Sequence, residues 1–192
     1  GNVIAGVPLA ANGDYAGVPL LGLLSPFTLV VGALGFAMCM AAGAAWVALK
    51  TEHASAVHER TEKQRRVWHV VALALFAVAT VLAFAVVKPQ FAPGMLGAGV
   101  IFAIAFVACI AASIAQAKKG NDLAAFVLQS IAAVCLVALA AVSLFPNLVV
   151  AAPGSVGESI TLMNAASSDT SLAWMTGIAC IGVPLVLVYH VI

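Results

Sequence analysis

The chain has 192 residues, of which 64% are hydrophobic and only 8% are charged, whereas soluble domains are about 25% charged. This composition, with a mean hydropathy of +1.15, excludes an ordinary soluble domain and indicates an integral membrane protein. The formal net charge of +1 gives no electrostatic basis for binding nucleic acid, so we expect no nucleic-acid partner.

The hydrophobic residues gather in runs that have the length of membrane-spanning helices. Residues 27–49 carry no charge, and a helix of that length, at about 1.5 Å per residue, crosses a hydrocarbon core of about 30 Å. All fifteen charged residues lie outside five such runs, because a charge in hydrocarbon is costly. We predict an all-α integral membrane protein with a transmembrane bundle over 27–192, whose spans are 27–49, 68–87, 95–116, 123–145 and 174–192.

The distribution of Lys and Arg predicts the orientation of these spans. Five of the eight basic residues lie between Lys50 and Arg66, Lys118 and Lys119 fall on the same side, and Lys88 falls on the other. Basic residues concentrate in cytoplasmic loops of membrane proteins. We therefore expect cytoplasmic loops at 50–67 and 117–122, an extracytoplasmic segment at 1–26, and outer loops at 88–94 and 146–173.

Within the predicted spans, polar side chains are few. A pump or transporter would normally place an ionisable group at mid-membrane, and none is present, so we expect no catalytic residue in this chain. Gln129 and Ser130 form the most polar mid-span pair, which favours hydrogen bonding between helices over a water or proton path. Gly182 and Pro184 predict a kink in the last span.

The histidines and cysteines give little support for a metal or haem site. His53 and His58 lie in the basic loop, whereas His69 and His190, near the inner ends of their spans, are the only pair that could ligate a haem. Anchoring of a helix end is the commoner role for such a histidine. The four cysteines lie in apolar runs without CxxC spacing; they are Cys39, Cys109, Cys135 and Cys180. The triplet Met38-Cys39-Met40 could not bind one ion, because consecutive residues of a helix point in different directions. We therefore expect no metal ligand in this chain.

One helix face in the first span carries small residues at intervals of four. Gly35, Cys39 and Gly43 would allow close approach of another helix. We expect this stripe to pack tightly inside a bundle, against a helix of this chain or of another subunit.

Three segments of the sequence resemble subunit II of the cytochrome bd type quinol oxidases. They are GNVIAGVPLAANGDYAG leading into SPFTLVVGAL, GAAWVALKTE at the end of the first span, and GESITLMNAASSDTSL before the last span. Their order and spacing match the family, and the resemblance covers essentially the whole chain. Members of the family are about twice as long with roughly eight spans, so the chain resembles the C-terminal portion of such a subunit, after the third span.

The resemblance implies a complex in the bacterial cytoplasmic membrane that oxidises quinol and reduces dioxygen to water. In that family the two b-type haems, the d-type haem and the quinol-oxidising loop belong to subunit I, so the expected role of this chain is a scaffold that ligates no haem itself. Implied partners are the haem-bearing subunit I, quinol, membrane lipid and small accessory subunits, and a structural quinone or lipid could bind to the spans. The residues alone leave open a small-solute secondary transporter or a purely structural membrane protein.

The orientation can be tested with single cysteines at Ser55 and Ser155, in a chain whose native cysteines are replaced. A membrane-impermeant maleimide added to intact spheroplasts should label Ser155→Cys and leave Ser55→Cys unlabelled, because the seven-to-one Lys/Arg asymmetry places residue 55 inside. Labelling after lysis provides the control for reactivity. The opposite labelling pattern would reverse the topology.

Overall fold

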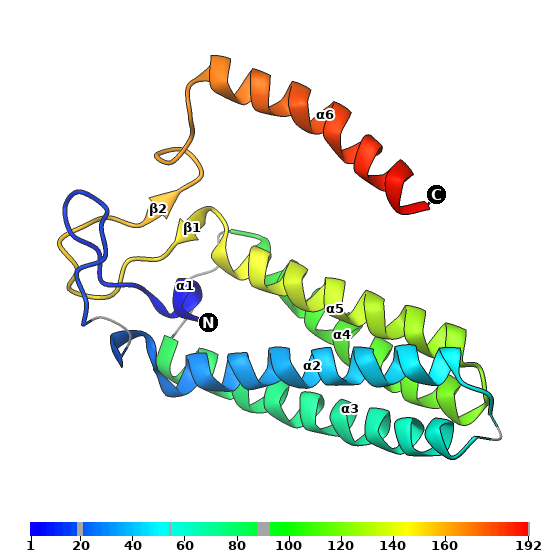
Figure 1. Ribbon diagram of the computed structural model, residues 1–192. Helices are drawn as coiled ribbons and strands as arrows, with labels where there is room; N and C mark the ends of the chain where they lie inside the picture. The colour runs from blue at the N-terminus through cyan, green and yellow to red at the C-terminus, as the bar shows by residue number, and fades with distance from the viewer. Residues whose placement is uncertain (19–20, 54, 88–92, 192) are drawn as a thin grey trace. The chain divides into compact units, whose positions relative to one another are not determined.

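The computed structural model describes residues 1–18, 21–53, 55–87 and 93–191 (Figure 1). Long helices dominate, which confirms the all-α class, and within the described residues five helices are long and apolar enough to cross a membrane. The elements are α1 (Asn2–Ala5), η1 (Leu21–Leu23), α2 (Pro26–Lys50), α3 (Ala56–Leu82), the π-helical turn η2 (Ala83–Val87), α4 (Met95–Lys118), α5 (Asp122–Leu144), β1 (Asn147–Val149), β2 (Ile160–Thr161) and α6 (Asp169–Val191).

The chain divides into two units, Gly1–Ile160 and Thr161–Ile192. The first unit contains a bundle of two antiparallel helical hairpins, α2 with α3 and α4 with α5, and the two hairpins associate chiefly through α2 and α5 (Figure 1). Both hairpin connections, 51–55 and 119–121, lie at the same end of the bundle. We call this the charged end, because Lys50, Lys118 and the charged first turns of α3 lie there.

Local sequence signals determine where the bundle helices begin. Ser25 and Thr28 form a reciprocal capping box at the start of α2, with Pro26 in the first helical position, where its fixed φ and missing N–H are tolerated. Asn121 caps α5 by accepting a hydrogen bond from the N–H of Ala124. Between α4 and α5 the chain reverses through Gly120, whose φ of 74° is strained for residues with a side chain.

Helix α3 begins twelve residues before the expected span. The segment 50–67 was predicted to be a loop, yet α3 starts at Ala56, where the Ser55 side chain caps the N–H of His58. The predicted start of this helix was placed where the apolar run begins. A helix that continues into charged sequence beyond the hydrocarbon has no change in hydropathy at its true start. The consequence is that the charged residues from Glu59 to Arg66 stand at fixed helical positions.

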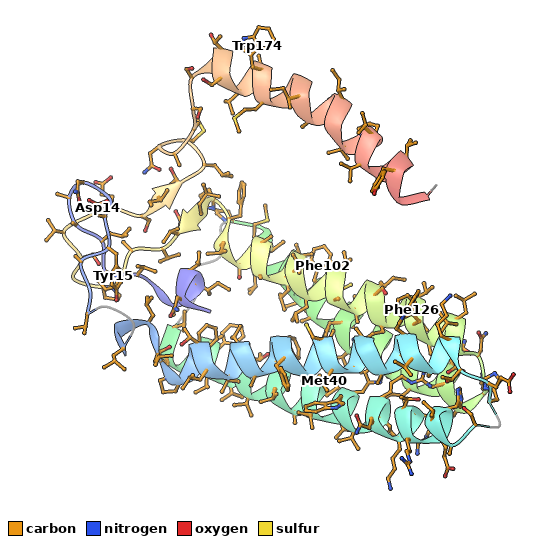
Figure 2. All side chains as sticks on the ribbon, viewed as in Figure 1. Asp14, Tyr15, Met40, Phe102, Phe126 and Trp174 are labelled. Atoms are coloured by element: carbon orange, nitrogen blue, oxygen red, sulfur yellow. The ribbon has the colours of Figure 1, made fainter. Side chains whose placement is uncertain are left out.

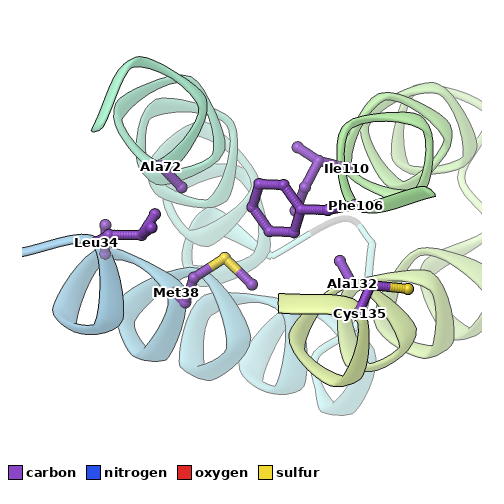
Figure 3. Packing of buried hydrophobic residues seen from close by; sticks show 8 residues of the cluster. Leu34, Met38, Ala72, Phe106, Ile110, Ala132 and Cys135 are labelled. Atoms are coloured by element: carbon purple, nitrogen blue, oxygen red, sulfur yellow. The ribbon is translucent and has the colours of Figure 1, made fainter. Parts of the chain in front are cut away.

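A cluster of apolar side chains from all four bundle helices forms the core (Figure 3). The Phe106 and Ile110 side chains of α4 are fully buried at its centre, and Phe76 packs on Phe106 with ring centroids 4.7 Å apart. The other members are small or flexible enough to fill the remaining space, and the buried cluster consists of Leu34, Ala37, Met38, Ala72, Phe106, Ile110, Ala132 and Cys135.

The stripe of small residues in α2 packs against no described helix of this chain, and its tight packing against a helix of another subunit stays a prediction. Gly35, Cys39 and Gly43 are exposed, and a Cβ added at either glycine would meet nothing within 4 Å. The close helix contacts of α2 use its buried alanines instead, among them Ala37, Ala41 and Ala45. Either set suits close approach, and the spacing alone does not distinguish them.

At the end of the bundle opposite the charged end, residues 7–9 hydrogen-bond to residues 150–157, which are far away in the sequence. The N–H of Val7 donates to the carbonyl of Val150 at 2.9 Å, the N–H of Ala152 donates to Val7, and the N–H of Gly157 donates to Leu9. Strands β1 and β2 form a short two-stranded sheet nearby. The expected outer loop at 88–94 lies outside the described residues except for Pro93 and Gly94.

The second unit, Thr161–Ile192, consists mainly of α6. This helix begins at Asp169, five residues before the expected span, and it continues through Pro184 without interruption. The helix is thus not interrupted at Pro184, and the expected kink there stays a prediction.

Two isoleucines of α4 test the core. Ile110 is 0% exposed and Ile104 is 64% exposed, so Ile110→Ala should create a cavity and lower the stability of the protein by about 3 kcal/mol, whereas Ile104→Ala should change it little. Thermal unfolding of the two purified variants in the same detergent measures the difference. Equal losses of stability would contradict the assigned core face of α4.

Candidate functional site

The bundle buries a charged pair at its charged end. The Arg65 side chain is 1% exposed, and its Nη1 donates a hydrogen bond to Oδ1 of Asp122 at 3.0 Å. Asp122 is the first residue of α5, where the partial positive charge of the helix N-terminus favours a carboxylate. The pair connects α3 with α5, and removal of one partner from a buried pair costs about 3–5 kcal/mol.

Two histidines surround the other carboxylate oxygen of Asp122. Nε2 of His58 and Nδ1 of His53 lie 3.6 Å and 3.5 Å from Oδ2, and the two nitrogens lie 3.2 Å from each other. His58 is buried, whereas the His53 side chain is 66% exposed. Among the described residues, these three are the group that could hold a metal ion, although the sequence analysis expected no metal ligand.

A second polar pair lies one helical turn deeper in the bundle. The fully buried His69 donates from Nε2 to Oε1 of Gln129 at 2.6 Å, since a carbonyl oxygen can only accept. The Gln129 Nε2 in turn donates to the backbone carbonyl of Met38 at 3.4 Å. One glutamine side chain thus links α3, α5 and α2, as expected for a polar residue that hydrogen-bonds between membrane helices.

A small cavity lies beside one member of each pair. It has a volume of about 10 Å³, and Arg65 and His69 contribute to its lining with Glu62 and Ile114. Nη2 of Arg65 and Nδ1 of His69 make no hydrogen bond to any described residue. The cavity is the size of one water molecule, and the two residues contribute an unpaired donor, Nη2 of Arg65, and an unpaired acceptor, Nδ1 of His69.

The structure separates residues that the sequence analysis treated together. Gln129 is buried and bridges helices, whereas its neighbour Ser130 is exposed and donates to the carbonyl of Phe126 in its own helix. Met38 lies in the core, while Met40 faces outward (Figure 2). Of the other haem-ligand candidate, His190, the structure describes the backbone only.

Sequence reasoning missed the Arg65–Asp122 pair and the histidines beside it. Arg65 was expected to face water in a basic loop, and the structure buries it because α3 extends that far. A signal was present in the spacing: the buried residues His58, Arg65, His69 and Ala72 follow one another at intervals of seven, four and three. This is the period of one helix face, so the core-facing stripe of α3 continues through the charged segment.

The described residues thus define a multi-span helical membrane protein with a polar cluster at one end of its bundle. The family model described as cytochrome bd terminal oxidase subunit II matches residues 1–192, so the chain belongs to that family and the resemblance seen in the sequence is confirmed. Among curated proteins, cytochrome bd-I ubiquinol oxidase subunit 2 of Escherichia coli K12 is 26% identical over 220 residues, as is the protein of that name from E. coli O157:H7. The matches cover 98% of this chain, which spans 57% of the length of those relatives.

The bridging role of Gln129 can be tested against its neighbour. Gln129→Leu leaves the buried N–H of His69 without an acceptor, so stability should fall by about 1–3 kcal/mol, whereas Ser130→Ala, at an exposed site, should cost almost nothing. Thermal unfolding of both variants gives the comparison. If the leucine variant were as stable as the wild type, the hydrogen bond would not matter to the bundle.

Proposed function

We propose that this chain is a scaffold subunit of a cytochrome bd type quinol:dioxygen oxidoreductase in the bacterial cytoplasmic membrane. The complex would oxidise quinol and reduce dioxygen to water in aerobic respiration. The observation that carries the proposal is the match of the family model to all 192 residues, together with relatives whose names identify subunits of a ubiquinol oxidase. Nothing in these comparisons favours a small-solute transporter.

The proposal assigns the haem irons, two of b type and one of d type, to a partner, subunit I. In support, the buried His69 already uses Nε2 for Gln129, and the cavity beside its ring, at about 10 Å³, is far too small for a porphyrin. A larger hollow of about 390 Å³ on α5 is lined by alanines and valines, which cannot ligate iron. Neither of these two spaces therefore offers both room and a ligand for a haem, which supports placing the haems in the partner.

The exterior of the bundle supports a role in assembly. Large apolar side chains are exposed along the helices, for example Ile101 and Ile104 of α4 and Val134 and Val137 of α5. In a membrane such surfaces face lipid or another apolar helix bundle, since neither requires polar groups. The proposed partners are accordingly lipid and the haem-bearing subunit, with small accessory subunits beside them.

A visible spectrum tests the proposed complex. The complex is purified from native membranes through a tag on this chain, and the reduced-minus-oxidised spectrum should show b-type and d-type haem bands. A colourless preparation that retains the chain intact would overturn the proposal.

The scaffold role is tested with the same spectrum on a double variant, His69→Ala with His190→Ala. If this chain ligates no iron, haem content per assembled complex should equal that of the wild type, even if the yield falls, because all axial ligands remain. Selective loss of one haem per assembled complex would instead place an iron ligand in this chain.

A further inference from the structure

We propose that His53, His58 and Asp122 form a binding site for a zinc-class divalent cation at the charged end of the bundle. The three residues come from the α2–α3 connection, the first turn of α3 and the first position of α5. The proposal does not depend on the proposed respiratory function, because it rests on the positions of three donor atoms within the first unit. It departs from the sequence-based expectation that this chain holds no metal ligand.

The distances between the donor atoms match a tetrahedral metal site. Ligands about 2.0–2.1 Å from Zn²⁺ at tetrahedral angles stand about 3.3 Å from one another. Nδ1 of His53, Nε2 of His58 and Oδ2 of Asp122 are separated by 3.2 Å, 3.5 Å and 3.6 Å. A single cation can therefore contact all three atoms with only small side-chain adjustments.

The surrounding hydrogen bonds leave Nε2 of His58 and Oδ2 of Asp122 available as ligand atoms. Nδ1 of His58 lies 3.2 Å from the carbonyl oxygen of Ala48, which can only accept, so Nδ1 carries the proton and Nε2 is free to coordinate. On Asp122, Arg65 occupies Oδ1 while the buried Oδ2 accepts no hydrogen bond from a described residue. Metal-binding histidines and carboxylates are typically oriented by such outer hydrogen bonds.

Hydrogen bonding alone explains the cluster less well than a cation does. A proton on Nδ1 of His53 can be shared with Nε2 of His58 at 3.2 Å, but Oδ2 of Asp122 is then still buried without a donor, and its nearest nitrogens are 3.5 Å and 3.6 Å away. A buried acceptor without a partner is costly. A cation satisfies the three lone pairs at once.

The ligand set selects the class of metal. Two imidazoles and one carboxylate suit Zn²⁺ and its late transition-metal neighbours, whereas Mg²⁺ and Ca²⁺ prefer oxygen ligands. The exposed side of the site, where the His53 side chain is 66% accessible, leaves a fourth position open to a water ligand. A bound ion would connect the α2–α3 hairpin to the first turn of α5.

Zinc binding by the assembled complex tests the site. The tagged complex is stripped with a mild chelator and titrated with ZnSO₄ against a chromophoric competitor, and bound zinc is counted by mass spectrometry. The wild type should hold one more zinc ion per chain than His53→Ala, or should bind that ion at least about 100-fold more tightly, since even outer-shell changes cost 10–100-fold. His53 is largely exposed, so its truncation should not impair folding.

Matched controls distinguish the site from general binding to acidic groups. Glu52→Gln and Glu59→Gln remove exposed carboxylates from the same region and should leave zinc binding unchanged. Zinc should also raise the midpoint of thermal unfolding of the wild type and of both glutamine variants, because a ligand that binds the folded state stabilises it. It should not raise the midpoint of His53→Ala or His58→Ala. Equal zinc content and equal thermal shifts in wild type and His53→Ala would overturn the proposal.

Discussion

A charge in the hydrocarbon core of a membrane must be paired or moved to the surface, and this constraint accounts for most of the structure. The apolar runs predicted as spans carry no Asp, Glu, Lys or Arg, so helix packing there depends on shape and small residues. The burial of Arg65 is compensated by Asp122 at 3.0 Å, and that of His69 by the hydrogen bond that its Nε2 donates to Gln129. The polar interior of the bundle is therefore confined to the charged end and the turn next to it.

The helical membrane fold could be predicted from the sequence because its signal is local. Each long apolar run contains enough information to identify a helix that can cross a membrane, and the five helices of the structure begin or end within a few residues of most predicted limits. The exceptions are the starts of α3 and α6, where a helix extends into polar sequence. At α3, capping by Ser55 determines where the helix starts more than hydropathy does.

The candidate site could not be predicted in the same way because its residues come from distant parts of the chain. Asp122 lies 57 residues from Arg65, and no spacing rule links them without knowledge of which helices are neighbours. His53 and His58 looked like ordinary members of a solvated basic loop. Only the helical period that continues from Ala72 back to Arg65 and His58 indicated that this face would be buried.

The division of the bundle into two hairpins has a consequence for biosynthesis. The hairpin of α2 and α3 is complete before α4 and α5 emerge from the ribosome, so the nascent chain holds Arg65 and His69 before Asp122 and Gln129 exist to receive them. Docking of the second hairpin supplies both partners in one event. Until then the first hairpin holds one charged and one polar side chain without their native partners, so both polar contacts of the bundle depend on the second hairpin.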